Sequence, residues 1–286
     1  MVLSKPDLDR VVRLALEEDL GEHGADVTTA AVVDPDLMGE AVIVARKPGV
    51  ISGMHAAAKV FELVNLGLLP PCRFDALVAD GARVVTGDEV ARVNGPLASI
   101  LTAERTALNF LQRLSGIATI TRRYADVLSD YPNVTLLDTR KTTPGLRFLE
   151  RAAVLAGGGH NHRDGLWDAI LIKDNHVAAA GGVTEAITRA RRARMPVEVE
   201  VDTLDQLREA LDAGAEMVLL DNMSPELTRK AVEMTAGRAR LEASGGMTLE
   251  GAVAAAKAGV DRISVGALTH SAPALDLSLE VTKTWR

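Results

Sequence analysis

Cysteine, aromatic residues and long apolar runs are all scarce in this chain. Its 286 residues include one cysteine, Cys72, so no disulfide can form within the chain, and a reducing compartment is expected. Aromatic residues make up only 3%, so the core must be built from Leu, Val, Ile and Ala. No segment is apolar for long enough to span a bilayer, and the start, MVLSKPD, lacks the apolar stretch of a secretory signal. These absences predict a cytoplasmic protein that does not enter a membrane.

An excess of positive charge is also missing. Lysine and arginine total 32, aspartate and glutamate total 39, and the formal net charge is −7. Such an acidic balance argues against nonspecific nucleic-acid binding, because a phosphate backbone needs a positively charged footprint. A local cluster of basic residues can still bind a small anion. The charge balance therefore favours small charged ligands over nucleic acid.

The first hundred residues combine helical and strand-like patterns, which is typical of a small α+β domain. The expected elements are helices over 6–20 and 54–66, a strand over 39–46 and short strands broken by turns over 75–93. The run 26–29 (DVTT) is interpreted as a turn. A biotin or lipoyl carrier domain has a similar pattern, but it needs a lysine at a hairpin tip, and there is none between Arg73 and Arg92.

From residue 134 onward, short apolar runs alternate with segments of helical length. The runs are VTLLD (134–138), AILIK (169–173), VEVEV (197–201), MVLLD (217–221), RLEAS (240–244) and RISVG (262–266). The helices between them are expected to begin near Pro144, Val183, Thr203, Ser224 and Thr248. Strands and helices in alternation predict a parallel sheet, because parallel strands need crossover connections.

The fold class is therefore α/β, and two architectures suit six strand–helix units. An incomplete (β/α) barrel is favoured over an open doubly wound sheet, since no strand is followed by the Gly-x-Gly-x-x-Gly turn of a dinucleotide fold. A long helix over 101–128, with a break expected near Ser115-Gly116, leads into the barrel. We expect the smaller N-terminal domain to cover 1–115 and the barrel to cover 116–286, with the C-terminal tail free to return to the first domain.

Polar residues follow every one of the six expected strands. These positions are 138–141, 173–176, 202, 221–222, 244–246 and 264–267. In a barrel of parallel strands the carboxyl ends converge on one rim, where active sites are built. The sequence therefore predicts one polar site at that rim.

Basic residues gather after the first two of these strands. They are Arg140, Lys141, Arg147, Arg151, Arg163 and Lys173, accompanied by His160 and His162. Arginine matches the geometry of carboxylate and phosphate, and lysine acts as a point charge, so the group predicts an anion site. Arg147 and Arg151 are spaced four apart near Glu150, where an exposed helix face is an equally good interpretation. His160 and His176 are left without an assigned role.

The other strand ends carry acids and small residues. Glu200 and Asp221 are hard oxygen ligands suited to Mg²⁺, while Glu198 shares the face of Glu200. The last two strands end in the turns 244–246 and 264–266, whose backbone amides can bind a phosphate. The expected ligands carry a phosphate, a metal-bound polyanion and further carboxylates. Phosphoribosyl pyrophosphate together with an aromatic dicarboxylate meets that description.

Eight runs of the chain resemble the quinolinate phosphoribosyltransferase family, also known as carboxylating nicotinate-nucleotide pyrophosphorylase. The runs are TAERTALN (102–109), SGIAT (115–119), DTRKTTPGLR (138–147), GGGHNHR (157–163), IKDNH (172–176), EVEV (198–201), LDN (220–222) and EASGG (242–246). They extend over nearly the whole chain. The resemblance implies an N-terminal α/β sandwich domain, an incomplete barrel and a homodimer in which the N-terminal domain of one subunit covers the barrel mouth of the other.

The resemblance also assigns roles to residues of this chain. The implied substrate-binding residues are Arg105, which would reach the partner's site, Thr139, Arg140, Lys141, His162, Arg163, Lys173, Glu200, Asp221, Ala243, Ser244, Gly245, Ser264, Val265 and Gly266. The implied catalytic residues are Lys141, Lys173, Glu200 and Asp221. Glu200 and Asp221 would hold Mg²⁺, and Arg140, Lys141, His162 and Arg163 would bind the quinolinate carboxylates.

The implied reaction transfers a phosphoribosyl group to quinolinate with decarboxylation, giving nicotinate mononucleotide, pyrophosphate and CO₂, in NAD biosynthesis. Two alternatives remain open. One is a related phosphoribosyltransferase that acts on another pyridine, such as nicotinate, which has a single carboxylate and needs fewer cations. The other is a non-catalytic protein on the same scaffold that binds a phosphate ligand, against which the acids Glu200 and Asp221 argue.

Overall fold

The structure is a computed structural model that describes residues 5–21, 24–64 and 71–286. The chain forms two compact units. The first unit contains 1–120, 143–158 and 272–286, and the second contains 121–142 and 159–271. The end of the helix expected over 54–66 lies outside the described residues.

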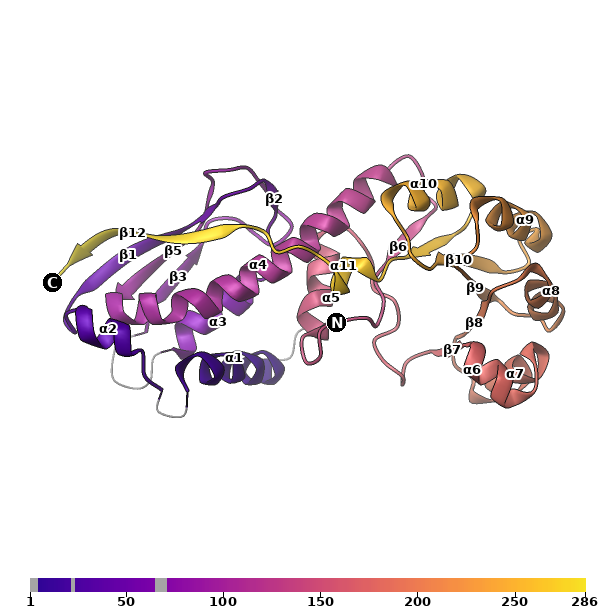
Figure 1. Ribbon diagram of the computed structural model, residues 1–286, viewed down its shortest axis with the longest axis horizontal. Coiled ribbons are helices and arrows are strands. Elements are labelled where there is room, and N and C mark those ends of the chain that lie inside the picture. The colour runs from indigo at the N-terminus through magenta and orange to yellow at the C-terminus, as the bar shows by residue number, and fades with distance from the viewer. Residues whose placement is uncertain (1–4, 22–23, 65–70) are drawn as a thin grey trace. The chain divides into compact units, whose positions relative to one another are not determined.

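The first unit contains an antiparallel sheet with the strand order β12-β1-β5-β3, and a separate pair formed by β2 and β4. The strands are β1 (Met38–Ala45), β2 (Gly49–Val50), β3 (Arg73–Ala76), β4 (Arg83–Val84), β5 (Glu89–Pro96) and β12 (Leu277–Trp285). The C-terminal strand β12 runs along β1, as Figure 1 shows in yellow beside indigo. The tail of the chain therefore completes the sheet of the first unit.

Five helices of the described residues belong wholly or partly to the first unit. They are α1 (Lys5–Leu20), α2 (Val27–Val32), α3 (Met54–Leu63), the first part of α4 (Leu97–Val127) and α5 (Arg147–Ala156). The run 26–29, interpreted above as a turn, opens α2 instead, because the Asp26 side chain accepts the amide of Thr29 at 2.9 Å and caps the helix. None of the helices in the described ranges has the length and apolar character needed to cross a membrane.

Helix α4 runs through Ser115 and Gly116 without interruption, so the break expected there is wrong. The Ser115 hydroxyl accepts the amide of Ser52 at 3.0 Å. A Cβ on Gly116 would lie 2.1 Å from the carbonyl oxygen of Pro273. These two small residues therefore serve close packing against neighbouring backbone, and an interior glycine weakens a helix by only about 1 kcal/mol.

The second unit contains a six-stranded parallel sheet with the order β6-β11-β10-β9-β8-β7. The strands are β6 (Thr135–Leu137), β7 (Ile170–Ile172), β8 (Val197–Val201), β9 (Met217–Asp221), β10 (Arg240–Ser244) and β11 (Arg262–Ser264). All six coincide with the predicted apolar runs, and β8, β9 and β10 match them residue for residue. The predicted fold class is confirmed.

Helices follow these strands along the chain, and most of them lie along the outside of the sheet in Figure 1. They are α6 (Asp174–Ala180), α7 (Val183–Ala190), η1 (Arg191–Ala193), α8 (Leu204–Asp212), α9 (Pro225–Thr235), α10 (Leu249–Ala258) and α11 (Ala267–His270). The hydroxyl groups of Thr203, Ser224 and Thr248 cap α8, α9 and α10, as predicted. Helices α6 and α11 are short and were not predicted.

Strand register brings polar residues together on one face of the parallel sheet. Glu200 of β8 pairs with Leu219 of β9, and Leu219 pairs in turn with Glu242 of β10. Two residues further along, Asp221 of β9 pairs with Ser244 of β10. Because side chains alternate along a strand, these residues share one face. The face carries acids and small polar residues at the carboxyl ends of the strands.

Candidate active site

A cavity of about 660 Å³ lies at the carboxyl ends of the parallel strands, and all of its lining residues belong to the second unit. The lining consists of Thr139, Arg140, Lys141, His162, Arg163, Leu171, Lys173, Glu200, Leu219, Asp221, Asn222, Glu242, Ser244, Gly245, Gly246, Met247, Ser264, Gly266, Ala267 and His270. Its volume suits one or two small polar molecules. Cations, carboxylates and small-residue turns therefore meet in one cavity, as the sequence predicted.

The segment after β6 is held in place by backbone contacts. The Lys141 amide donates to the Thr139 hydroxyl at 3.1 Å, and the Lys141 carbonyl accepts the Thr269 hydroxyl at 2.8 Å. The Lys141 side chain runs past the Cα of Gly266, and a Cβ on Gly266 would lie 3.1 Å from Lys141 Cδ. The position of the Lys141 backbone therefore does not depend on the Lys141 side chain, which carries the ammonium group into the cavity.

A buried carboxylate fixes the loop that carries the next cations. Asp138, at the end of β6, is fully buried. Its Oδ1 accepts the His162 amide at 2.7 Å, and its Oδ2 accepts the Asn161 side chain at 2.7 Å. The backbone of His160 also pairs with Leu137 of β6. Asp138 therefore anchors the loop that leads to Arg163.

Arg163 lies close to a second positive charge. Its Nη1 donates to the carbonyl of Ala169 at 3.0 Å. Burial lowers the pKa of Arg163, and the positive charge of Arg140 lowers it further, while Asp168 and Glu198 act in the opposite direction. Like charges held together repel one another, and an anion placed between them relieves that repulsion. The pair therefore favours binding of an anion.

The two predicted metal ligands lie at the ends of adjacent strands. Glu200 Oε2 accepts Lys173 Nζ at 2.6 Å, and Asp221 Oδ2 accepts the side chain of Asn222 at 2.7 Å. Both carboxylates line the cavity. Lys173 is held there from the start of α6, where the ring of His176 accepts its amide at 2.9 Å. His176 is thus part of the helix start and not of the cavity lining.

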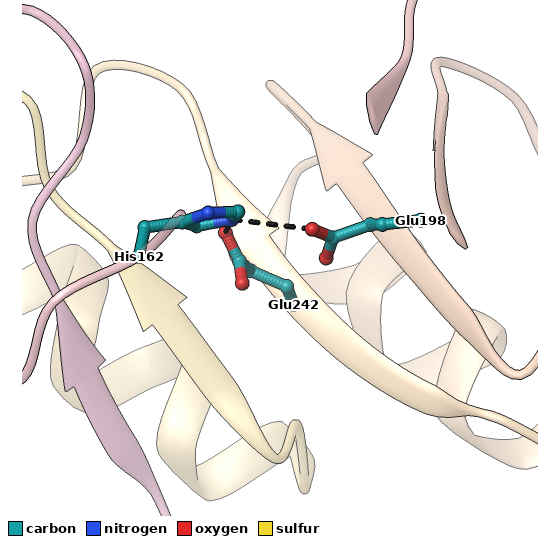
Figure 2. Close-up of side chains that lie close together, drawn as sticks. All are labelled: His162, Glu198 and Glu242. Atoms are coloured by element: carbon teal, nitrogen blue, oxygen red, sulfur yellow. Dashed lines mark ion pairs between the residues drawn. The ribbon is translucent and has the colours of Figure 1, made fainter. Parts of the chain in front are cut away.

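His162, Glu198 and Glu242 form a cluster in the wall of the cavity, and Figure 2 shows the ring directed toward the two acids. His162 Nε2 lies 3.1 Å from Glu198 Oε2 and 3.4 Å from Glu242 Oε1. The guanidinium of Arg262 faces the same acids, with Nε 3.2 Å from Glu242 Oε2. Its positive charge works against a metal ion between the three side chains.

Contacts within the chain act in opposite directions on the protonation of the His162 ring. The amide of Arg163 donates to Nδ1 at 2.7 Å and so opposes a proton there. Burial lowers the pKa of His162, but the contacts with Glu198 and Glu242 and their negative charges outweigh burial and raise it to about 9. The Arg163 amide can donate only to the neutral ring, in which the proton on Nε2 faces the acids; protonation of Nδ1 breaks that bond.

The turn after β10 requires glycine. Gly245 has φ +94°, and a Cβ there would lie 2.2 Å from the Asn222 Oδ1 atom. The Asn222 amide donates to the carbonyl of Ser244 at 3.0 Å, which ties the ends of β9 and β10 together. The turn thus exposes backbone to the cavity without a side chain in the way.

Of the predicted substrate-binding residues, the cavity lining includes twelve. They are Thr139, Arg140, Lys141, His162, Arg163, Lys173, Glu200, Asp221, Ser244, Gly245, Ser264 and Gly266. Ala243 and Val265 are buried and lie outside the lining, and Arg105 is exposed on α4 in the first unit. Arg147 and Arg151 lie on α5, also in the first unit, and Arg151 is only 5% exposed.

The predicted set lacked Glu242 and His270, which both line the cavity. A signal for Glu242 was present in the sequence. It lies two residues before Ser244 in the same strand and therefore on the same face, and a charged residue inside a short strand is unusual. His270 ends the four-residue helix α11, which has no periodic pattern of its own. Its position could not be read from the sequence.

Both parts of the chain match models of one family. The model described as "Quinolinate phosphoribosyl transferase, C-terminal domain" matches residues 117–280, and the one described as "Quinolinate phosphoribosyl transferase, N-terminal domain" matches residues 26–115. Together they cover most of the chain. The N-terminal model matches the earlier part of the chain and the C-terminal model the later part, in agreement with the order of the resembling runs.

Individual relatives agree with the family models. A probable nicotinate-nucleotide pyrophosphorylase (carboxylating) of Bacillus subtilis is 43% identical over 264 residues, which cover 90% of each chain. A chloroplastic nicotinate-nucleotide pyrophosphorylase (carboxylating) of Arabidopsis thaliana is 42% identical, over 96% of this chain and 83% of the relative. The solved structure of the nicotinate-nucleotide pyrophosphorylase from Francisella tularensis superposes with a TM-score of 0.89 at 39% identity and covers 98% of both chains.

Proposed function

The chain belongs to the quinolinate phosphoribosyltransferase family, and on that premise we propose that it transfers the phosphoribosyl group of phosphoribosyl pyrophosphate to quinolinate. The products are nicotinate mononucleotide, pyrophosphate and CO₂, which makes the protein a pentosyltransferase of NAD biosynthesis. One observation carries the proposal. A single cavity combines four Arg and Lys side chains, three carboxylates and two small-residue turns.

The cations favour quinolinate over a pyridine with one carboxylate. Arg140, Lys141, Arg163 and Lys173 line one cavity in a chain whose net charge is negative. Arginine can bind each carboxylate with two parallel hydrogen bonds, and lysine adds charge without a fixed direction. Two adjacent carboxylates on one ring offer the matching negative charge. Nicotinate would leave part of this positive charge unbalanced.

The small-residue turns suit the phosphate of the second substrate. The turn 244–246 and the turn 264–266 lie on neighbouring strands β10 and β11. Backbone amides in such turns bind phosphate oxygens without a side chain between them. We assign the 5-phosphate of phosphoribosyl pyrophosphate to these turns. The ribose then extends toward Glu200 and Asp221.

The residues present are suited to Mg²⁺. This ion is usually held by one or two carboxylates together with substrate phosphates, and Glu200 and Asp221 supply two carboxylates in the same cavity. Lys173 contacts one oxygen of Glu200, which leaves the second oxygen of that carboxylate for an ion. Bound there, Mg²⁺ would neutralise charge on the pyrophosphate. We therefore assign Glu200 and Asp221 as its ligands.

In the proposed reaction the pyridine nitrogen attacks the anomeric carbon of the ribose while the bond to pyrophosphate breaks. Arg140, Lys141 and Arg163 hold the ring by its carboxylates and so fix the direction of attack, and such positioning supplies much of the rate. Lys173 contributes positive charge beside the reacting centre. The new pyridinium withdraws electrons, so the adjacent carboxylate can leave as CO₂, and a proton takes its place on the ring. The ring supplies the electron sink for this step.

Turnover with two substrates tests this function directly. We expect the protein to convert quinolinate and phosphoribosyl pyrophosphate to nicotinate mononucleotide with one CO₂ released per product, and to lose this activity when EDTA removes divalent ions. Liquid chromatography and labelled CO₂ measure both products. Nicotinate serves as the comparison substrate. Equal or faster turnover of nicotinate, or binding of both ligands without any product, would contradict the proposal.

Arg105 and the dimer extend the proposal to two subunits. Arg105 is exposed on α4 in the first unit and is assigned to the active site of the partner subunit. If active sites are shared in this way, each site combines Arg105 of one subunit with Lys141 of the other. Arg105→Ala and Lys141→Ala then remove groups that come from different subunits. A dimer containing one copy of each variant then keeps one intact site. The location in the cytoplasm is part of the same proposal.

Mixing the two inactive variants tests the shared site. After subunit exchange, half of the dimers combine both variants and each of these has one native site of two, so we expect about a quarter of wild-type activity. Steady-state assays of the mixture and of each variant alone measure the recovery. Activity in the mixture no higher than in the separate variants would contradict a shared site.

A further inference from the structure

Two buried glutamates, one of which lines the cavity, have no part in the reaction described above. Glu198 is 3% exposed and Glu242 is 1% exposed. Within the described ranges, their carboxylate oxygens have ion-pair contacts but no hydrogen-bond partner. Burying such carboxylates is unfavourable unless opposite charges compensate. Their position inside the barrel therefore points to a specific task.

The His162 ring connects these acids to Arg163. Its Nε2 faces Glu198 and Glu242, as Figure 2 shows, and its Nδ1 accepts the backbone amide of Arg163 at 2.7 Å. Both ring nitrogens are thus occupied within the chain. In this arrangement neither nitrogen is directed at a ligand, although His162 lines the cavity.

We propose that Glu198 and Glu242 are positioning residues that act through His162. They hold the ring in one orientation, the ring holds the backbone of Arg163, and the Arg163 guanidinium binds the dicarboxylate. This inference rests on the proposed function, in which Arg163 is a substrate-binding residue. His162 then supports dicarboxylate binding by orientation, instead of by the direct contact that the sequence led us to expect.

The surrounding charges support this arrangement. Arg262 from β11 faces the oxygens of both acids, with Nη1 4.0 Å from Glu198 Oε1 and Nε 3.2 Å from Glu242 Oε2. Asp138 from β6 accepts the backbone amide of His162. Asp138 therefore fixes the backbone of His162, and Glu198 and Glu242 fix its ring at Nε2. Arg262 compensates part of the negative charge, which leaves Glu198 Oε2 and Glu242 Oε1 facing the ring.

Single substitutions at the two acids test the effect on substrate binding. We expect Glu198→Gln and Glu242→Gln each to raise the KM for quinolinate about tenfold or more, and to change the KM for phosphoribosyl pyrophosphate by less than about twofold. The matched control is Glu216→Gln, an exposed glutamate next to the opposite end of β9, which should behave as wild type. Equal increases in both KM values, or a loss confined to kcat, would overturn the inference.

A double-mutant cycle tests whether the acids act through His162. In a His162→Phe background, Glu198→Gln and Glu242→Gln should change the KM for quinolinate by less than about twofold, because the connection to Arg163 is already lost. Additive effects in this cycle would show that the acids act by another route. Circular dichroism of each variant confirms that the comparison is made between folded proteins.

A measurement on the wild-type protein without substrate separates this inference from the proposed function. With ¹⁵N-labelled histidine, we expect the Nε2 proton of His162 to be visible by NMR and protected from exchange with water, and its signal to shift in Glu198→Gln and Glu242→Gln but not in Glu216→Gln. An unprotected proton in the wild type would sink the inference even if quinolinate is turned over. A protected proton in a protein that does not turn over quinolinate would sink the proposed function alone.

Discussion

Replacing Lys141 with alanine is expected to abolish most turnover, a loss of roughly 30-fold to several thousand-fold in kcat/KM. Removing one member of a charged binding set costs about 2–5 kcal/mol, and each 1.4 kcal/mol is a factor of ten. The ammonium group of Lys141 is one of four cationic groups lining the cavity. The proposed substrates are polyanions throughout, so both binding and the stabilisation of the leaving group depend on it. Arg163→Ala is expected to have an effect of the same size.

The fold should survive the loss of the Lys141 side chain. Lys141 is exposed, and the two hydrogen bonds that hold its segment use backbone atoms, which alanine retains. Lys230→Ala on α9 is the matched control, because it removes the same charge from an exposed helix position outside the cavity lining. Steady-state kinetics and circular dichroism of both variants provide the measurement. Wild-type rates in Lys141→Ala or Arg163→Ala would refute the assignment of this cavity.

The parallel sheet could be predicted because its strands have strong local signals. Strands β8, β9 and β10 are each five residues long and followed by a helix with a Thr or Ser cap, and β8 and β9 are rich in Val and Leu. Local pattern and tertiary structure agree at every one of these positions. Strand ends then follow from strand positions, which is why most of the predicted site residues meet in one cavity.

Other elements depend on contacts between residues far apart in the sequence. The glycine at position 116, within the uninterrupted helix α4, reflects a close approach to Pro273, which no local pattern reveals. Helix α2 has six residues, too few for a helical period to be distinguished from a turn. Strand β12 has exposed residues over most of its length, so its pairing with β1 leaves only a weak pattern in the sequence.

The interior of the barrel shows the same limit. Types of residue at strand ends can be read from the sequence, but the directions in which they point cannot. The resemblance implied that His162 binds the quinolinate carboxylates, and in the structure Nε2 faces Glu198 and Glu242 and Nδ1 accepts a backbone amide. Those acids come from two different strands. Their meeting with the ring is a property of the folded sheet.

Substituting alanine for Gly245 is expected to raise the KM for phosphoribosyl pyrophosphate by about 100-fold or more, because a displacement of about 1 Å at a binding site can cost that factor. The new Cβ would lie 2.2 Å from Asn222 Oδ1 and 2.7 Å from the Asn222 backbone nitrogen. Backbone cannot move aside as the tip of a flexible side chain can. The turn assigned to the 5-phosphate must therefore shift.

A second glycine separates this effect from backbone strain in general. Gly237 also has a positive φ, +75°, and a Cβ there would meet no atom within 4 Å. Gly237→Ala and Gly245→Ala should therefore share a loss of about 1–2 kcal/mol in the free energy of unfolding from the left-handed backbone alone. Only Gly245→Ala should change the KM for phosphoribosyl pyrophosphate, since Gly237 precedes β10 at the end away from the cavity. Equal KM values in the two variants would mean that the turn after β10 does not hold the phosphate.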